Sequence, residues 1–149
     1  KGSGSKTIKG ISIKGIATYH DPSKGSERGA NTIFTLKIDN IQLCHLGDLG
    51  HLLSDKELAE IGPVDILLIP VGGFFTIDSK EATRVTEQIK PKILIPMHFK
   101  TEKCGFPISP VEDFLKGKTN AKRPKANEAT FDKATLPQQM EIVVLEHAL

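Results

Sequence analysis

The feature that most constrains the fold is an almost unbroken apolar segment from Val64 to Val71, in which Asp65 is the one charged residue. Runs of this kind are typical of strands that are covered on both faces. A second such segment extends from Lys92 to Pro96, after an interval long enough for a helix. Strands that alternate with helices favour a layered α/β (α+β) fold, and we expect one here.

The intervals around these strands carry helix-start signals. Ser54 with Glu57, and Asp78 with Glu81, match the capping-box pattern, in which side chains satisfy the free amides of a first helical turn. A third start is indicated by proline at position 110, which is favoured in the first turn. The predicted helices cover residues 55–61, 79–89 and 110–116.

An antiparallel hairpin is predicted around the turn pair Asp39-Asn40. From Asn31 to Asp39 apolar residues alternate with polar ones, and Ile41–His45 provides the return strand. Glycine-broken or shorter apolar runs occur near both ends of the chain. The remaining predicted elements are two short strands within residues 7–18, loops at 21–29 and 118–133, and a final strand near a sheet edge at 140–145.

Size and charge limit the classes of function. At 149 residues the chain fits a single domain that covers residues 1–149. A formal net charge of +2 gives no reason to expect nucleic acid or an anionic membrane as a partner. No apolar run approaches the roughly 20 residues of a membrane-spanning helix. Cys44 and Cys104 make neither a disulfide framework nor a zinc knuckle, so we expect a cytoplasmic protein.

Three chemically active residues stand where extended apolar runs end: His20, Asp48 and His98. Strand ends joined by Gly- and Pro-containing loops commonly carry reactive side chains. Histidine and aspartate are also ligand types that zinc accepts. We therefore interpret the three residues as one metal site. Their spacing has no local signature, so two interpretations stay open: hydrogen-bonded loop histidines, and a turn aspartate that bonds its own backbone.

Two further histidines flank Asp48. Strand alternation places His45 on the opposite face from Cys44, which favours a structural role. His51 is either a partner behind the ligands or a surface histidine. Cys44 itself is expected to be a small buried apolar residue.

Four motifs, taken in their order along the chain, resemble one known family. Together they are similar to the metallo-β-lactamase superfamily, and most of all to its ascorbate-6-phosphate lactonase-like branch of zinc-dependent hydrolases. The resemblance covers the chain from about Ile11 to Phe99, and it implies that the chain is part of an αββα sandwich. The motifs are Tyr19-His20-Asp21 with Arg28-Gly29-Ala30-Asn31-Thr32, His45-Leu46-Gly47-Asp48-Leu49-Gly50-His51, the segment from Asp65 to Gly73, and Pro91-Lys92 with Ile95-Pro96-Met97-His98-Phe99.

The resemblance also implies roles for individual residues. His20 would bind a first metal, Asp48 would bridge two metals and His98 would bind the second, with Asp48 and His20 as catalytic residues. One or two zinc ions are implied, and manganese or iron is compatible with the same ligand types. A metal-held hydroxide would attack an ester, lactone or phosphodiester in a small-molecule substrate. Asp21, Arg28 and Gly73 would then flank that substrate.

One departure from the family pattern changes the expectation. The principal signature of the family, His-x-His-x-Asp-His, does not occur in residues 1–149. A catalytic zinc normally has three protein ligands and an open position, so the site would be incomplete. We expect the chain to be the C-terminal portion of a longer metal-dependent hydrolase. Two alternatives remain: another chain, such as a homodimer partner, supplies the ligands, or the chain is a non-catalytic structural or interaction module.

Overall fold

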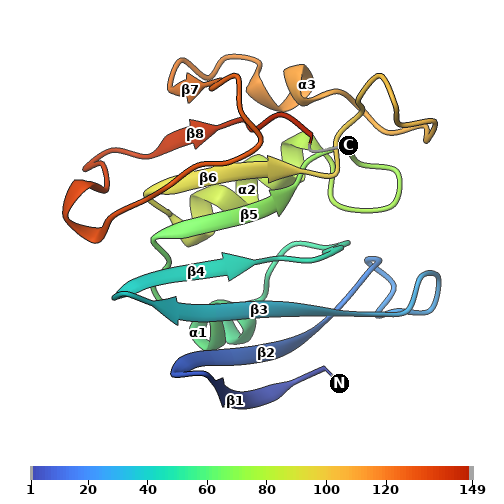
Figure 1. Ribbon diagram of the computed structural model, residues 1–149. Helices are drawn as coiled ribbons and strands as arrows, with labels where there is room; N and C mark the ends of the chain where they lie inside the picture. Colours follow the sequence, from blue (N-terminus) through green and yellow to red (C-terminus); the bar gives the residue numbers. More distant parts are fainter. Residues whose placement is uncertain (1, 148–149) are drawn as a thin grey trace.

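The strands of the computed structural model, which describes residues 2–147, form an eight-stranded sheet in the order β1-β2-β3-β4-β5-β6-β8-β7 (Figure 1). Neighbours from β1 to β4 are antiparallel, and neighbours from β4 onward are parallel. The predicted mixed α/β class is therefore confirmed. The strands are β1 (Gly4–Ile8), β2 (Ile11–Tyr19), β3 (Ala30–Ile38), β4 (Ile41–His45), β5 (Ile66–Pro70), β6 (Ile93–Met97), β7 (Ala121–Lys122) and β8 (Glu141–Val143).

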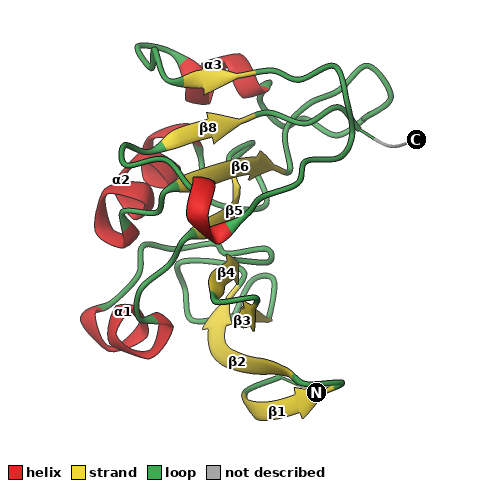
Figure 2. Ribbon diagram, turned by 60° about the vertical axis from the view of Figure 1, so that its left-hand side comes forward, coloured by secondary structure: helices red, strands yellow, loops and turns green. Residues whose placement is uncertain are grey.

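Three helices cover one face of this sheet: α1 (Asp55–Ile61), α2 (Ser79–Ile89) and α3 (Val111–Leu115). Figure 2 shows α1 and α2 on the same side of the strands. Both predicted capping boxes form, because Ser54 and Asp78 each accept an amide of the first turn while Glu57 and Glu81 bond back. The core between helices and sheet includes the fully buried side chains of Phe114, Leu67, Ile69, Leu94 and Ile142.

The opposite face of the sheet is covered over only part of its width. A one-turn helix, η1 (Lys133–Thr135), and its flanking residues Phe131 and Leu136 pack on Ile66 and Ile93. Farther along the sheet the same face is open: Phe34 is 40% and Ile38 37% exposed, whereas Thr35, on the helix side of β3, is 4% exposed. The alternation predicted for β3 is therefore present.

The hairpin is also as predicted, and the C-terminal third departs from the prediction. Asp39 and Asn40 both have positive φ, which suits the two-residue turn between β3 and β4. In the segment expected to be a loop, β7 pairs with β8 in parallel. The predicted final strand, β8, lies between β6 and the edge strand β7, which agrees with its expected place near a sheet edge. A two-residue strand is too short to leave a periodic signal in sequence.

Asp65 fastens the η1 segment to the sheet. Its carboxylate accepts the Gln42 amide at 2.9 Å and the Lys133 ammonium at 2.6 Å, and Lys92 lies at 3.4 Å. Burial raises the pKa of this carboxyl, but the Gln42 amide and the two ammonium groups lower it more, so the net shift is downward. A carboxyl with a depressed folded-state pKa stabilises the fold above its unfolded pKa and loses that contribution as pH falls.

Asp65→Asn is therefore expected to lower the free energy of unfolding by about 1–2 kcal/mol at pH 7, because the amide keeps its shape and loses two charged partners. The difference from wild type should shrink as pH falls below about 4, where the wild-type carboxyl also becomes protonated. Urea denaturation at pH 7 and pH 3 measures both effects. Glu112→Gln, which breaks the exposed pair with Arg123, is the control and should cost less than about 1 kcal/mol. A pH-independent loss in Asp65→Asn would contradict the assignment.

Candidate functional site

The strands that carry the predicted site residues run in the same direction. β2 and β4 are both antiparallel to β3, and β4, β5 and β6 are mutually parallel, so β2, β4 and β6 end at one edge of the sheet (Figure 1). In sheets of this kind ligands bind outside the carboxyl ends of the strands. His20 directly follows β2, Asp48 lies three residues after β4, and His98 directly follows β6.

The structure brings His20, Asp48 and His98 together in one cavity of about 330 Å³. The nearest pair is Asp48 and His98, whose Oδ1 and Nε2 atoms are 3.0 Å apart. Both side chains are about half exposed. The Asp48 carboxylate thus faces a histidine instead of bonding its own turn. The other residues that line the cavity are Gly73, Phe75, Thr76, Phe106 and Ile108.

The turn that carries Asp48 is held by Asn31 on β3. The Asn31 Oδ1 atom accepts the Asp48 amide at 2.9 Å, and its Nδ2 donates to Thr18 at 2.8 Å and to the Leu46 carbonyl at 2.9 Å. Three hydrogen bonds from one side chain fix the turn between β2 and β4. The backbone of Asp48 is therefore fully held while its carboxylate remains directed to the cavity.

His20 contributes a buried ring nitrogen that has no partner among the described residues. Its Nε2 atom is inaccessible to solvent and makes no hydrogen bond. Its backbone amide donates to Gly29 at 3.0 Å, so the chain around it is ordered by the neighbouring loop. A buried polar atom without a partner costs about 1–3 kcal/mol, and a ligand bound at this position would satisfy it.

The donor chemistry fits a metal ion, whereas the number of converging donors does not complete a site. Two imidazoles and one carboxylate line the cavity. Within residues 2–147, however, no group of three or more His, Cys, Asp or Glu side chains is placed to hold an ion by itself. The role of His20, Asp48 and His98 as metal ligands stays a prediction.

Two of the three expected substrate contacts need correction. Asp21 is fully buried, and its carboxylate accepts the amides of Ser23, Gly25, Glu27 and Arg28 at 2.7–3.2 Å, so it shapes the loop and does not face the cavity. These bonds outweigh the effect of burial and lower the pKa of the Asp21 carboxyl. The Arg28 guanidinium lies 3.3 Å from Glu27, and Arg28 does not line the cavity. Gly73 does line it.

His51 and His45, which flank Asp48, make hydrogen bonds to the backbone around the site. His51 Nε2 accepts the Tyr19 amide at 3.2 Å, and its Nδ1 contacts the Leu52 carbonyl at 2.8 Å, so this ring joins the end of β2 to the loop after β4. His45 Nδ1 accepts the Gly47 amide at 3.0 Å. Burial and the nearby His98 lower the pKa of His45, against an opposing effect of Asp48. Sequence reasoning favoured a structural role for His45 and left His51 as either a partner behind the ligands or a surface histidine, and it missed Phe106 and Ile108.

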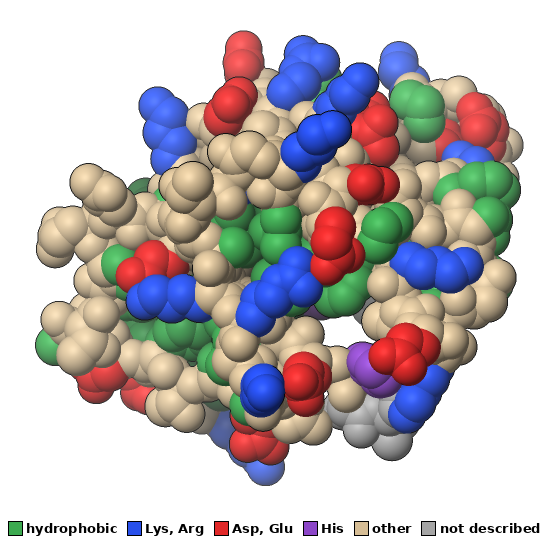
Figure 3. All heavy atoms as spheres, turned by 90° about the horizontal axis from the view of Figure 1, so that it is seen from above, with side chains coloured by type: hydrophobic (Ala, Val, Ile, Leu, Met, Phe, Trp, Pro, Cys, Tyr) green, Lys and Arg blue, Asp and Glu red, His purple; other side chains and the backbone are tan. Residues whose placement is uncertain are grey.

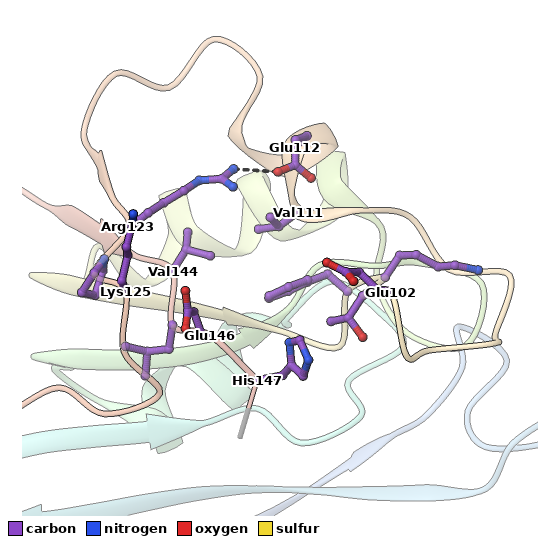
Figure 4. A pocket seen from close by; sticks show the side chains of 13 residues that line it. Glu102, Val111, Glu112, Arg123, Lys125, Val144, Glu146 and His147 are labelled. Atoms are coloured by element: carbon purple, nitrogen blue, oxygen red, sulfur yellow. Dashed lines mark hydrogen bonds and ion pairs between the residues drawn. The ribbon is translucent and has the colours of Figure 1, made fainter. Parts of the chain in front are cut away.

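A second cavity, of about 410 Å³, lies near the C-terminal end of the described chain (Figure 4). Its lining includes Glu102, Glu112, Arg123 and Glu146, and none of the predicted site residues. Arg123 is paired with Glu112 at 2.8 Å. Figure 3 shows acidic and basic side chains interspersed over the face seen from above β7 and α3. Among the described residues that line this cavity, none has a buried side-chain nitrogen or oxygen atom without a partner, as His20 Nε2 is.

No helix within residues 2–147 combines the length and apolar character needed to span a membrane.

A family model described as the beta-lactamase superfamily domain matches residues 1–98. A UPF0173 metal-dependent hydrolase from Carboxydothermus hydrogenoformans is 52% identical over 68 residues, which cover 46% of this chain and 30% of the relative. A UPF0173 metal-dependent hydrolase from Pyrococcus horikoshii is 36% identical over 101 residues, covering 66% of this chain and 44% of the relative. The chain thus spans less than half the length of these curated relatives.

Solved structures share the fold. A protein from Thermotoga maritima, described as a member of the metallo-beta-lactamase superfamily, superposes with a TM-score of 0.84 at 39% identity, and the match covers 97% of this chain and 70% of that one. Igni18, a metallo hydrolase from Ignicoccus hospitalis, superposes with a TM-score of 0.59 at 22% identity over 78% of this chain and 50% of its own, which shows the fold alone.

Proposed function

The chain belongs to the beta-lactamase superfamily domain family, and from this premise we propose that the cavity lined by His20, Asp48 and His98 takes part in metal-dependent hydrolysis of a small molecule. The bond that is hydrolysed in this proposal belongs to an ester, a lactone or a phosphodiester. The observation that carries the proposal is the meeting of His20, Asp48 and His98 in one cavity. The names of its relatives support the same reaction class.

His20 and Asp48 have distinct tasks in this proposal. His20 offers a buried ring nitrogen with no other partner. Asp48 offers a carboxylate with two oxygens, one of which is paired with His98. When bound, a zinc ion polarises a carbonyl or phosphoryl oxygen and lowers the pKa of water toward about 7. We propose zinc, with manganese or iron as the alternatives that the same donors accept.

We further propose that the ligand set is completed from outside the described residues. His20, Asp48 and His98 do not form a closed group of ligands. Three donors are too few to hold one ion tightly and also to bridge it to a second ion. The relatives are much longer than the part that this chain matches, which leaves room for the missing donors.

Elemental analysis of the chain, and of the complete gene product that contains it, tests this proposal. We expect one or two metal ions per complete product, weak and substoichiometric binding by the chain alone, and hydrolysis only by the metal-loaded product. Absence of metal from both forms would overturn the metal-dependent function. Stoichiometric metal and turnover with the chain alone would instead overturn the incomplete site.

The second candidate function is a non-catalytic structural or interaction module. The lack of a closed three-donor group within residues 2–147 favours it. It predicts that zinc raises neither the melting temperature of the complete product nor its activity. A zinc-dependent rise in melting temperature, with loss of that rise in His98→Ala, would decide for the hydrolase.

A further inference from the structure

One wall of the cavity is built from apolar rings. Phe75 and Phe106 both line it, with ring centroids 5.7 Å apart at an angle of 85°. Phe74 extends this stack through an edge contact with Phe75 at 4.6 Å. Phe106 is nevertheless 62% exposed. Several rings gathered at the rim of a cavity, with one largely open to solvent, are typical of a surface that binds an apolar ligand.

The wall is held by hydrogen bonds within two loops, between them and to the loop that follows β4. The Ser109 amide donates to the Gly72 carbonyl at 2.7 Å, and Lys100 Nζ donates to the Phe106 carbonyl at 2.7 Å. On the other loop, the Phe75 amide donates to Gly73 at 2.8 Å and the Ile77 amide donates to Leu49 at 2.9 Å. Such preorganisation lowers the entropy cost of binding.

Apart from a bound metal ion, the cavity offers an anionic substrate no lysine or arginine side chain. Among its lining residues Asp48 is acidic, and none is a lysine or arginine. The ammonium of Lys100 is already bonded to a carbonyl of the wall. A phosphorylated ligand would therefore find no ordinary cationic side chain in this cavity, whereas an uncharged ester with an apolar chain would find Phe75, Phe106 and Ile108.

We propose that the wall formed by Phe75, Phe106 and Ile108 binds the apolar acyl group of a neutral carboxylic ester or lactone. This inference rests on the proposed hydrolytic function and specifies its substrate class. In the reaction water adds to the acyl carbon, the ester C–O bond breaks, and a proton passes to the departing alkoxide, giving an acid and an alcohol. Phe106 positions the apolar acyl group and takes no part in the making or breaking of bonds.

Turnover of two esters that differ only in chain length tests the proposal. The metal-loaded complete product should hydrolyse p-nitrophenyl hexanoate with kcat/KM at least about tenfold above that for the acetate, because methylenes in an apolar pocket discriminate on this scale. In Phe106→Ala the ratio should fall to within about threefold of one, whereas Phe106→Leu should retain most of it. Ile38→Ala is the control, since Ile38 is an exposed apolar residue (37%) at the end of β3 and does not line the cavity. A ratio near one in wild type would overturn the proposal.

A binding measurement without metal separates this inference from the hydrolase proposal. In EDTA-treated protein, the neutral ketone 2-octanone should shift the methyl resonance of Ile108 saturably and bind at least about tenfold tighter than hexyl phosphate. The shift should be lost in Phe106→Ala and kept in Ile38→Ala. Binding of the ketone without turnover of any ester would keep the apolar site and sink the hydrolytic function. Tighter binding of hexyl phosphate would overturn the neutral substrate class.

Discussion

Asp48→Asn is expected to remove metal binding and to lower ester hydrolysis by more than about 100-fold while leaving the fold intact. Loss of a group behind a metal ligand already costs about 10–100-fold in affinity or activity, so loss of a direct anionic donor should exceed that range. The amide of asparagine matches the carboxylate in shape, so it can occupy the same place beside His98, whose Nε2 atom lies 3.0 Å from Asp48 Oδ1. The backbone bond from residue 48 to Asn31 does not involve the altered atoms.

Stability and metal content must therefore separate in this variant. The free energy of unfolding without metal should change by no more than about 0.5 kcal/mol, as expected for a half-exposed position. Isothermal titration with zinc and ester turnover measure the functional loss. Asp39→Asn, in an exposed turn with positive φ where asparagine is well tolerated, is the matched control and should keep both metal and activity. Wild-type zinc affinity in Asp48→Asn would remove Asp48 from the ligand set.

Local signals in the sequence predicted the elements that local chemistry determines. The caps at Ser54 and Asp78 and the turn at Asp39-Asn40 depend on residues within four positions, and all three form. The gathering of His20 and His98 followed from the positions of two strand ends, because strands that run in one direction end at one edge. The common direction of those strands is a finding of the structure and was not predicted.

The positions of Asp21 and Phe106 depend on contacts that form when the loops fold. Asp21 satisfies four amides because the loop to Arg28 closes around it, and an aspartate before proline in a glycine-containing loop was a signal for such a turn that could have been used. Phe106 reaches the cavity because Ser109 bonds Gly72 across two loops. The segment that carries it has no periodicity, so its position depends on the tertiary fold alone.

Two glycines set the distance between the loops and the histidines of the site. The Gly50 amide donates to the Tyr19 carbonyl at 3.0 Å, and a side chain at position 50 would overlap the backbone of His20 and Asp21. A side chain at Gly72 would overlap the His98 carbonyl. Each histidine is therefore pressed against a glycine on a neighbouring loop. Close backbone approach, and not an unusual φ, is what requires glycine at both positions.

Gly50→Ala is for this reason expected to lower the free energy of unfolding by about 3 kcal/mol, at the upper end of the range for overpacking, because the atoms that the new methyl meets are backbone and cannot rotate away. In a domain of this size the loss corresponds to a fall of roughly 6–12 °C in melting temperature. Gly105→Ala is the matched control, since a methyl there meets nothing within 4 Å and should be nearly neutral. Urea denaturation of both variants measures the difference.

The displaced His20 should also lower zinc affinity in Gly50→Ala, so that stability and metal binding fall together here, whereas they separate in Asp48→Asn. A stable Gly50→Ala protein would show that the loops can move apart, and the rigid placement of His20 would then be wrong.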